Sequence, residues 1–168
     1  VLTNSLASND AVAAHAGYAR YREGLLAMGI EMYEMRSEQR GTVSRFGAGT
    51  GSAGGTSGAS RASLHAKAVV VDSRLLVVGS MNLDLRSKLQ NSEVAIVIRN
   101  PKLAAEATAL IEPSMIQGAY RVELKDGQLV WRAPQGSGLA DATSEPDASA
   151  GLKLMVRVIA PFAPDEML

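Results

Sequence analysis

The sequence predicts an α/β domain in which a mixed β-sheet is flanked by helices. A strand, a helix and another strand follow one another within residues 1–35, which is the order of a parallel crossover unit. Further along the chain, apolar β-branched runs come in pairs that are joined by short polar turns, as in antiparallel hairpins. A sheet built from both arrangements has parallel and antiparallel neighbours, so it is mixed.

The composition is that of a globular protein with a packed core. Hydrophobic residues make up 46% of the 168 positions and charged residues 20%. There is no cysteine, which excludes disulfides and thiolate metal sites, and no apolar run is long enough for a transmembrane helix. The chain opens on Val1 and Leu2 without an initiator Met, so we expect it to be part of a longer protein.

The crossover unit at the start of the chain is expected to contain one helix. Residues 1–4 predict the end of a strand, and residues 8–10 (Ser-Asn-Asp) offer side-chain oxygens that can cap a helix. Apolar residues at spacings of three and four extend this helix to about Met28, and Gly29 is expected to end it. The alternation over residues 30–35 predicts the second strand.

The middle of the chain predicts a hairpin and a further strand. A Gly/Ser/Thr/Ala tract at residues 47–60 is expected to be a loop. After it, the runs LHAKAVVVD and LLVVGS form the two arms of the hairpin, with the turn at residues 72–74. Residues 93–99 predict the next strand.

The last third of the chain predicts a helix, a hairpin and a tail. A helix is expected over residues 101–115, with a proline at its first turn, and an Asp-Gly turn within residues 120–131 predicts a second hairpin. We expect one domain over residues 1–132, followed by a flexible linker over residues 133–150, which are rich in Pro, Gly, Ser and Asp. Residues 151–168 predict a helical tail, although their alternation also fits a strand.

Polar and small residues recur along the predicted hairpin and just beyond its end. They stand at fixed spacing: His65, Lys67, Asp72, Gly79, Ser80 and Asn82. On a strand, side chains two residues apart share a face, so His65 and Lys67 project together. The second arm of the hairpin returns to the same end of the sheet and adds the hydrogen-bond donors of Ser80 and Asn82. This arrangement predicts a pocket for a tetrahedral anion.

The residue types in this pocket suit a phosphodiester. A phosphodiester is anionic, so a site must neutralise its oxygens while it places the attacking atom in line. Lys67 and Asn82 are expected to hold the phosphate. A neutral imidazole is nucleophilic near pH 7 and can release the phosphoryl group again, so His65 is the expected nucleophile.

Two acidic residues are assigned supporting roles. Asp72 belongs to the catalytic motif with His65 and Lys67, but its strand parity is opposite to theirs, so we expect it to fix the hairpin or neighbouring basic groups. Glu93 is expected to orient and polarise His65 from behind. His15, on the first helix, either approaches the substrate entrance or is a surface or packing residue, and the second reading is favoured. Trp131 is either a membrane-surface anchor or a packing residue of the last hairpin.

The run LHAKAVVVDSRLLVVGSMN resembles the HKD motif of the phospholipase D superfamily, including its Gly-Ser-x-Asn extension. The segments VLTNSLASND, HAGYARYREGLLAMGIEMYE and NSEVAIVI are similar, more narrowly, to the C-terminal half of bacterial cardiolipin synthases of the C type. The likeness covers roughly residues 1 to 112, and the ending APFAPDEML is weakly similar. It implies a phospholipase D-like domain over residues 1–132.

The resemblance implies a two-step transfer through a phosphohistidine, with no metal and no other cofactor. Two HKD motifs face each other in such enzymes, and one His attacks while the other protonates the leaving alcohol. This chain has one motif, so its partner is a second HKD half, either in the full-length chain or in a homodimer mate. The implied substrate is a phospholipid, the implied activity is cardiolipin synthesis by phosphatidyl transfer, and the implied location is the surface of the bacterial inner membrane.

Two alternatives stay open. The first is a phosphodiesterase of phospholipase D or nuclease type, because the same pocket accepts any phosphodiester. Residues 36–102 hold ten Lys or Arg and four Asp or Glu, a net charge of +6, but the whole chain has a formal net charge of zero, so nucleic acid is not the expected partner. The second alternative is a non-catalytic half that pairs with another HKD domain.

Overall fold

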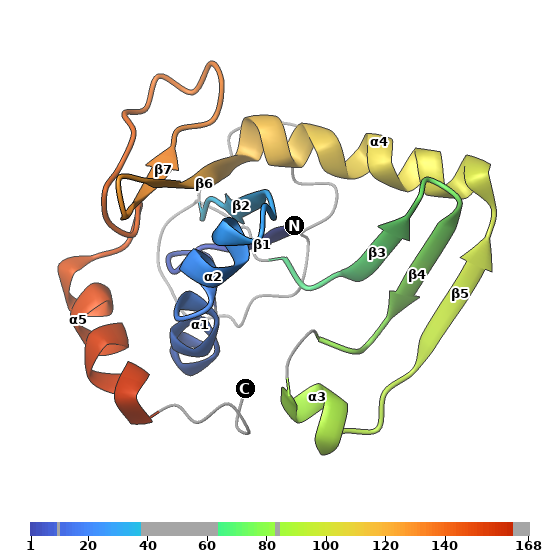
Figure 1. The fold of residues 1–168 in the computed structure, drawn as a ribbon, viewed down its shortest axis with the longest axis horizontal. Coiled ribbons are helices and arrows are strands. Elements are labelled where there is room, and N and C mark those ends of the chain that lie inside the picture. The colour runs from blue at the N-terminus through green and yellow to red at the C-terminus, as the bar shows by residue number, and fades with distance from the viewer. Residues whose placement is uncertain (10, 38–63, 83–84, 163–168) are drawn as a thin grey trace, which may run out of the picture.

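The computed structural model describes residues 1–9, 11–37, 64–82 and 85–162, and its strands form two β-sheets. The larger sheet has the order β1-β2-β6-β7 and contains β1 (Leu2–Asn4), β2 (Met32–Met35), β6 (Ala119–Lys125) and β7 (Gln128–Arg132). The smaller sheet has the order β3-β4-β5 and contains β3 (Lys67–Val71), β4 (Leu75–Gly79) and β5 (Ala95–Arg99). The helices are α1 (Val12–Ala19), α2 (Arg22–Ala27), α3 (Leu85–Leu89), α4 (Pro101–Gly118) and α5 (Ala150–Ile159), with the short helix η2 (Ala160–Phe162) after α5. Figure 1 shows the smaller sheet on one side of the molecule, with α4 extending from it to the larger sheet.

The larger sheet confirms the predicted α/β class and the mixed pairing. β1 pairs with β2 in parallel, with α1 and α2 as the crossover, while β6 pairs antiparallel with both β2 and β7. Asp126 and Gly127 have φ angles of 51° and 75°, which is the pair of positive angles that a two-residue hairpin turn requires.

The sequence predicts one sheet, but the strands divide between two. Among the strands that the structure describes, β3 forms a ladder only with β4, so it lies at the edge of the smaller sheet. The link between the sheets at this point is made by the side chain of Asn4 rather than by a ladder, as described below. The apolar pattern of a strand predicts the arms of a hairpin well, but it does not predict which other strand pairs with the outer arm.

The crossover contains two helices where the sequence predicts one. The N–H of Tyr21 donates to the carbonyl of Tyr18 at 3.0 Å, a tighter turn than the α-helical spacing, and this turn separates α1 from α2. The expected cap is also different, because Ala11 precedes α1 and makes no side-chain cap. The end of the crossover is as predicted, since Gly29 has a φ of 84° and follows Met28, the C-cap of α2.

The core lies on the larger sheet. Met32, Tyr120, Val122 and Trp131 form its buried centre, and half-buried side chains from α1 and α2 pack against it. Trp131 is therefore a packing residue of the β6–β7 hairpin, which settles the choice left open by the sequence. The buried residues of α1 are His15, Ala16 and Gly17, so His15 is also a packing residue.

The smaller sheet is thinly covered. Asp72 and Ser73 form the turn between β3 and β4, with φ angles of 50° and 52°. Asn100 caps α4 by accepting hydrogen bonds from the backbone of Lys102 and Leu103, with Pro101 at the first turn as predicted. Apolar side chains nevertheless remain exposed on this sheet: Val69, Val78, Ile96 and Val97.

The C-terminal segment returns to the first helices. Residues 133–150 were expected to be an exposed, flexible linker, but Pro134 and Pro146 are buried and Glu145 contacts α1 and α2. The helical tail is confirmed over α5, which packs against α1. The division of the chain into domain, linker and tail stays a prediction. The tract at residues 47–60 and the last residues of the tail, 163–168, lie outside the described residues, and within the described ranges no helix could cross a bilayer.

Candidate active site

The register of the first hairpin places the motif. Lys67 is paired with Gly79 across β3 and β4, so the start of one arm meets the end of the other, as the sequence predicts. Gly79 is also paired with Ala95 of β5, and a Cβ on Gly79 would lie 2.5 Å from the carbonyl oxygen of Val94. A glycine is therefore required here because the backbones of β4 and β5 approach closely.

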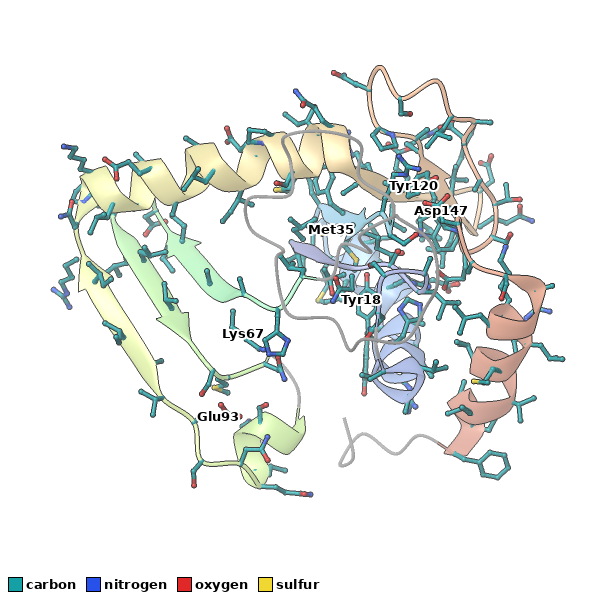
Figure 2. All side chains as sticks on the ribbon, turned by 180° about the vertical axis from the view of Figure 1, so that it is seen from behind. Tyr18, Met35, Lys67, Glu93, Tyr120 and Asp147 are labelled. Atoms are coloured by element: carbon teal, nitrogen blue, oxygen red, sulfur yellow. The ribbon has the colours of Figure 1, made fainter. Side chains whose placement is uncertain are left out.

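His65 and Lys67 lie together at this end of the sheet. His65 is exposed and stands just before β3, while Lys67 is half-buried and its Nζ donates to the carbonyl oxygen of His65 at 3.0 Å. The ammonium of Lys67 is thus held over the backbone of His65, with its charge free of any carboxylate ion pair among the described residues. Figure 2 shows Lys67 and Glu93 at the same end of the smaller sheet.

Glu93 contacts Ser80 rather than His65. The hydroxyl of Ser80 donates to Oε2 of Glu93, and the N–H of Val94 donates to the Ser80 hydroxyl at 3.1 Å. The hydrogen bond from Ser80 lowers the pKa of Glu93, and the positive charge of Lys67 contributes in the same direction. Among the described residues no hydrogen bond joins Glu93 to His65, and the partner found for the Glu93 carboxylate is Ser80, at the end of β4.

The remaining two predicted residues do not join this group. Asn82 follows β4, is exposed, and has no side-chain hydrogen bond to any described residue, so its amide is available to a ligand. Asp72 lies in the hairpin turn, five residues from Lys67 along an extended strand, which is roughly 16 Å away. Asp72 therefore cannot share a phosphate with Lys67, and the supporting role inferred from its parity fits this position better than a catalytic one.

A shallow depression lies at that distant end of the hairpin. It is lined by residues of the turn and of the strand ends around it: Val71, Asp72, Arg74, Leu75, Arg99 and Pro101. It contains neither His65 nor Lys67, so it is not the site predicted from the motif.

Asn4 is a residue of the site that sequence reasoning missed. Its Nδ2 donates to the carbonyl oxygen of Leu64 at 2.9 Å, and the N–H of Leu64 donates to its Oδ1 at 2.7 Å. Both backbone groups of the residue next to His65 are thus held from the end of β1. The available signal was an amide at the carboxyl end of a strand in an α/β protein, which is where ligand sites concentrate.

A second polar cluster is buried between α1, α2 and the larger sheet. Glu34 accepts hydrogen bonds from Nε of Arg22 at 2.7 Å, from the hydroxyl of Tyr18 at 3.0 Å and from Nε1 of Trp131 at 2.9 Å. Arg22 also reaches Glu145 at 2.6 Å and the Nε2 of His15 at 2.9 Å. Every member faces the interior of the protein, so the cluster is structural and not part of the phosphate site.

Burial and the neighbouring charges shift the pKa values of three members of this cluster: Arg22, Tyr18 and Glu145. Burial alone would lower the pKa of Arg22, but Glu34 and Glu145 outweigh it and raise that pKa. Burial raises the pKa of Tyr18, and the neighbouring carboxylate of Glu34 raises it further. The pKa of Glu145 is lowered, because its contacts with His15 and Arg22 outweigh the opposite effect of burial.

The motif-bearing end of the hairpin gathers groups that suit a tetrahedral anion. It provides an exposed imidazole, one ammonium group and one free amide, which can attack, neutralise and orient a tetrahedral anion. The acidic residue gathered there is Glu93, whose lowered pKa favours the ionised form over the protonated one that could donate to a leaving alcohol.

Residues 1–114 match the family described as cardiolipin synthase, PLD-like domain. The chain is 37% identical over 171 residues to cardiolipin synthase C of Escherichia coli (strain K12), which covers all of this chain and 34% of that protein. It is 31% identical over 157 residues to an uncharacterized protein of Helicobacter pylori (strain J99), covering 92% of this chain and 29% of that protein. Cardiolipin synthase A of Yersinia pseudotuberculosis is 35% identical over 71 residues, covering 42% of this chain and 14% of that protein.

No solved structure matches the chain significantly. The chain spans about a third of the length of the curated relatives that it matches throughout. The resemblance that the motif indicates is confirmed by the family match over residues 1–114 and by the identity over the whole chain. The chain belongs to the family of cardiolipin synthase domains of the phospholipase D type.

Proposed function

We propose that this chain is the motif-bearing C-terminal half of a phosphatidyltransferase that makes cardiolipin, with His65 as its nucleophile. The observation that supports this most is the placement of His65 beside Lys67 at the open end of the first hairpin. The substrate assignment is supported by the relative that aligns with the whole chain, which is a cardiolipin synthase.

The transfer divides into two displacements at phosphorus. In the first, a ring nitrogen of neutral His65 attacks the phosphorus of phosphatidylglycerol, a P–N bond forms, and the P–O bond to the glycerol headgroup breaks. The leaving alkoxide takes a proton from an acid of the second half. In the second, the hydroxyl of another phospholipid or alcohol attacks, loses its proton to that same group, and displaces the imidazole.

The other residues stabilise the charge. Lys67 faces the oxygens that gain negative charge, and Asn82 donates to one of them from its side-chain amide. Glu93 acts on the site through Ser80 and through the charge of Lys67 rather than through His65. Asp72 acts at the turn, where it fixes the hairpin.

The proposal requires a second half. The HKD pattern occurs once in this chain, and the relatives are about three times as long. The exposed apolar side chains of the smaller sheet support a packing partner there, because a monomer seldom leaves several such residues uncovered on one small sheet. The second half is either the missing part of the longer chain or a second copy of this one.

The proposed location follows from the substrate. A phosphatidyl group is embedded in a bilayer, so the enzyme works as a peripheral protein at the surface of the bacterial inner membrane.

Two competing functions remain distinguishable by experiment: a nuclease-type or phospholipase-type hydrolase of another phosphodiester, and a half that only completes a partner. Neither is favoured by a specific contact in the structure.

Turnover of the full-length protein on phosphatidylglycerol vesicles tests the proposal, with the products identified by mass spectrometry. We expect cardiolipin and free glycerol from the unmodified protein and neither from His65→Ala. Lys125→Ala, an exposed substitution on the far hairpin, is the matched control and should not change turnover. Phosphatidic acid in place of cardiolipin would indicate hydrolysis. No lipid product, together with cleavage of DNA, would favour the nuclease. If the two halves form a stable complex that gives no product, the non-catalytic role would be favoured.

A further inference from the structure

The last helical segment carries an apolar face that is largely exposed rather than packed against the described part of the protein. Leu154, Met155 and Val158 of α5 have 62%, 50% and 59% of their surface exposed, and Phe162 of η2 has 79%. The spacings of one, four and eight residues from Leu154 place them along one side of the segment. We call these four residues the α5 face.

The α5 face is distinct from the face by which the helix is held. Leu152, Val156 and Ile159 are half-buried and recur at spacings of four and three, and α5 packs against α1. Ser149 caps the helix by accepting a hydrogen bond from the N–H of Leu152 at 3.2 Å. The helix therefore has two apolar sides, and only one is used inside the protein.

Ion pairs fix the orientation of the helix. Glu145 is joined to Arg22, which is buried, and Asp147 is joined to Arg36 at 3.2 Å and to the hydroxyl of Tyr120 at 3.2 Å. At the other end, Arg20 donates to the carbonyl oxygen of Ala160 at 3.3 Å. The α5 face cannot turn inward without breaking these contacts, so it stays directed outward.

The helical segment that carries the α5 face is basic, and the nearest acidic residues in the sequence stand outside it, at Asp147, Asp165 and Glu166. Residues 150–162 contain Lys153 and Arg157 and no acidic residue. Arg157 is exposed and lies three residues after Leu154, at the border of the apolar face. Lys153 is half-buried and donates to the hydroxyl of Ser144 at 3.0 Å, so Arg157 is the cation at the border of the apolar face. An apolar stripe bordered by a cation suits a helix that lies in the headgroup region of an anionic bilayer.

The position of α5 argues against the second motif-bearing half as its occupant. Figure 1 shows α5 on the opposite side of the molecule from β3, β4 and β5. A partner that faces His65 and covers the smaller sheet leaves the α5 face uncovered. The same position leaves the α5 face free to contact a membrane while the phosphate site contacts its partner.

We propose that the α5 face is a docking surface for an anionic phospholipid bilayer, with its apolar side chains in the headgroup boundary and Arg157 against lipid phosphates. The docking proposal rests on the proposed function only for its choice of lipid. Docking needs no turnover, so His65→Ala should bind vesicles as well as the unmodified chain does. Failure of docking and failure of catalysis are thereby distinguishable.

Binding of the 168-residue chain to vesicles tests the proposal. We expect flotation with vesicles that mix phosphatidylglycerol and phosphatidylcholine, and weak flotation with phosphatidylcholine alone. Leu154→Ser combined with Val158→Ser should weaken binding more than tenfold. Arg157→Gln should weaken binding to the anionic vesicles by about fivefold. The matched control is Leu110→Ser combined with Ile116→Ser, which removes similar exposed side chains from α4 and should leave binding unchanged.

A labelling experiment does not depend on the folding of the double variant. The chain has no cysteine, so Phe162→Cys and Leu110→Cys each provide one site for a polarity-sensitive dye. The dye at position 162 should shift to the blue on anionic vesicles, and the dye at position 110 should not. Equal binding by all variants, or no shift at position 162, would overturn the proposal. Self-association without vesicles that Leu154→Ser and Val158→Ser abolish would also overturn it, because the occupant would then be a second copy of the chain.

Discussion

Asn4 and Leu64 are joined by two hydrogen bonds that connect the end of β1 to the residue before His65. An amide that donates and accepts at once fixes the backbone of Leu64 in position and in orientation. Because the next residue is the proposed nucleophile, this pair sets where the imidazole begins its attack.

Asn4→Ala is therefore expected to lower kcat of the full-length protein by about tenfold to a hundredfold, because a small displacement of an attacking group is costly. KM should change little, since Asn4 does not contact the phosphate. Asn4→Asp retains the acceptor for the Leu64 N–H and loses the donor, so it should give an intermediate rate. Steady-state kinetics on phosphatidylglycerol vesicles measure both values.

The control for this prediction is Asn9→Ala, which removes one local hydrogen bond to the N–H of Ala11. It should leave kcat unchanged. An equal loss of kcat in Asn4→Ala and Asn9→Ala would show that Asn4 acts on the fold in general and not on His65.

Gly79→Ala should destabilise the protein by about 1–3 kcal/mol, because the added Cβ would lie 2.5 Å from the carbonyl oxygen of Val94 and force β4 and β5 apart. Gly24→Ala is the matched control. Nothing lies within 4 Å of a Cβ at Gly24, and alanine favours the helix there, so this variant should gain about 0.5–1 kcal/mol. Chemical denaturation measures both, and a neutral Gly79→Ala would show that the two strands are not closely packed at this point.

Ser80→Ala should raise the pKa of Glu93 toward its ordinary value, because the hydrogen bond from Ser80 favours the ionised carboxylate. The lowered pKa means that this interaction stabilises the folded protein above the ordinary pKa of glutamate and is lost as the pH falls through the lowered value. The measurement is an NMR titration of the Glu93 side chain in both proteins. Identical titration curves would contradict the assigned hydrogen bond.

Arg22→Leu should cost about 3–5 kcal/mol of stability, because it leaves the carboxylate of Glu34 buried without its cation. Arg121→Leu is the comparison. Arg121 pairs with Glu31 at 3.4 Å on the surface, and an exposed pair of this kind contributes less than about 1 kcal/mol. Denaturant midpoints distinguish the two variants, and similar losses would mean that the Arg22–Glu34 pair is open to water.

The sequence predicted the local elements well and the assembly of the strands less well. The turns at residues 72–73 and 126–127 were predictable because Gly and Asp tolerate positive φ and Ser is a common turn residue, and α4 was predictable from Asn100 and Pro101. The division into two sheets was not, since the alternation of apolar residues in β3 is the same whichever strand lies beside it.

The candidate site shows the same contrast. The grouping of His65, Lys67 and Ser80 followed from strand parity and hairpin register, which are properties of the sequence pattern. The partners of Glu93 and Asn4 did not, because each contact joins residues on different elements and depends on how those elements pack. The buried ion pair of Arg22 and Glu145 was missed for the same reason, since 123 residues separate its members and the second lies in a stretch that reads as a linker.

The decisive experiment is to trap the covalent intermediate on His65. The full-length protein is mixed with phosphatidylglycerol, quenched within the first turnover under alkaline conditions that preserve phosphohistidine, digested, and analysed by mass spectrometry. We predict a phosphatidyl adduct on the peptide that contains His65, and no adduct on that peptide in His65→Ala, which should also lose turnover. An adduct on a different residue, or full turnover by His65→Ala, would contradict the assignment of His65 as the nucleophile.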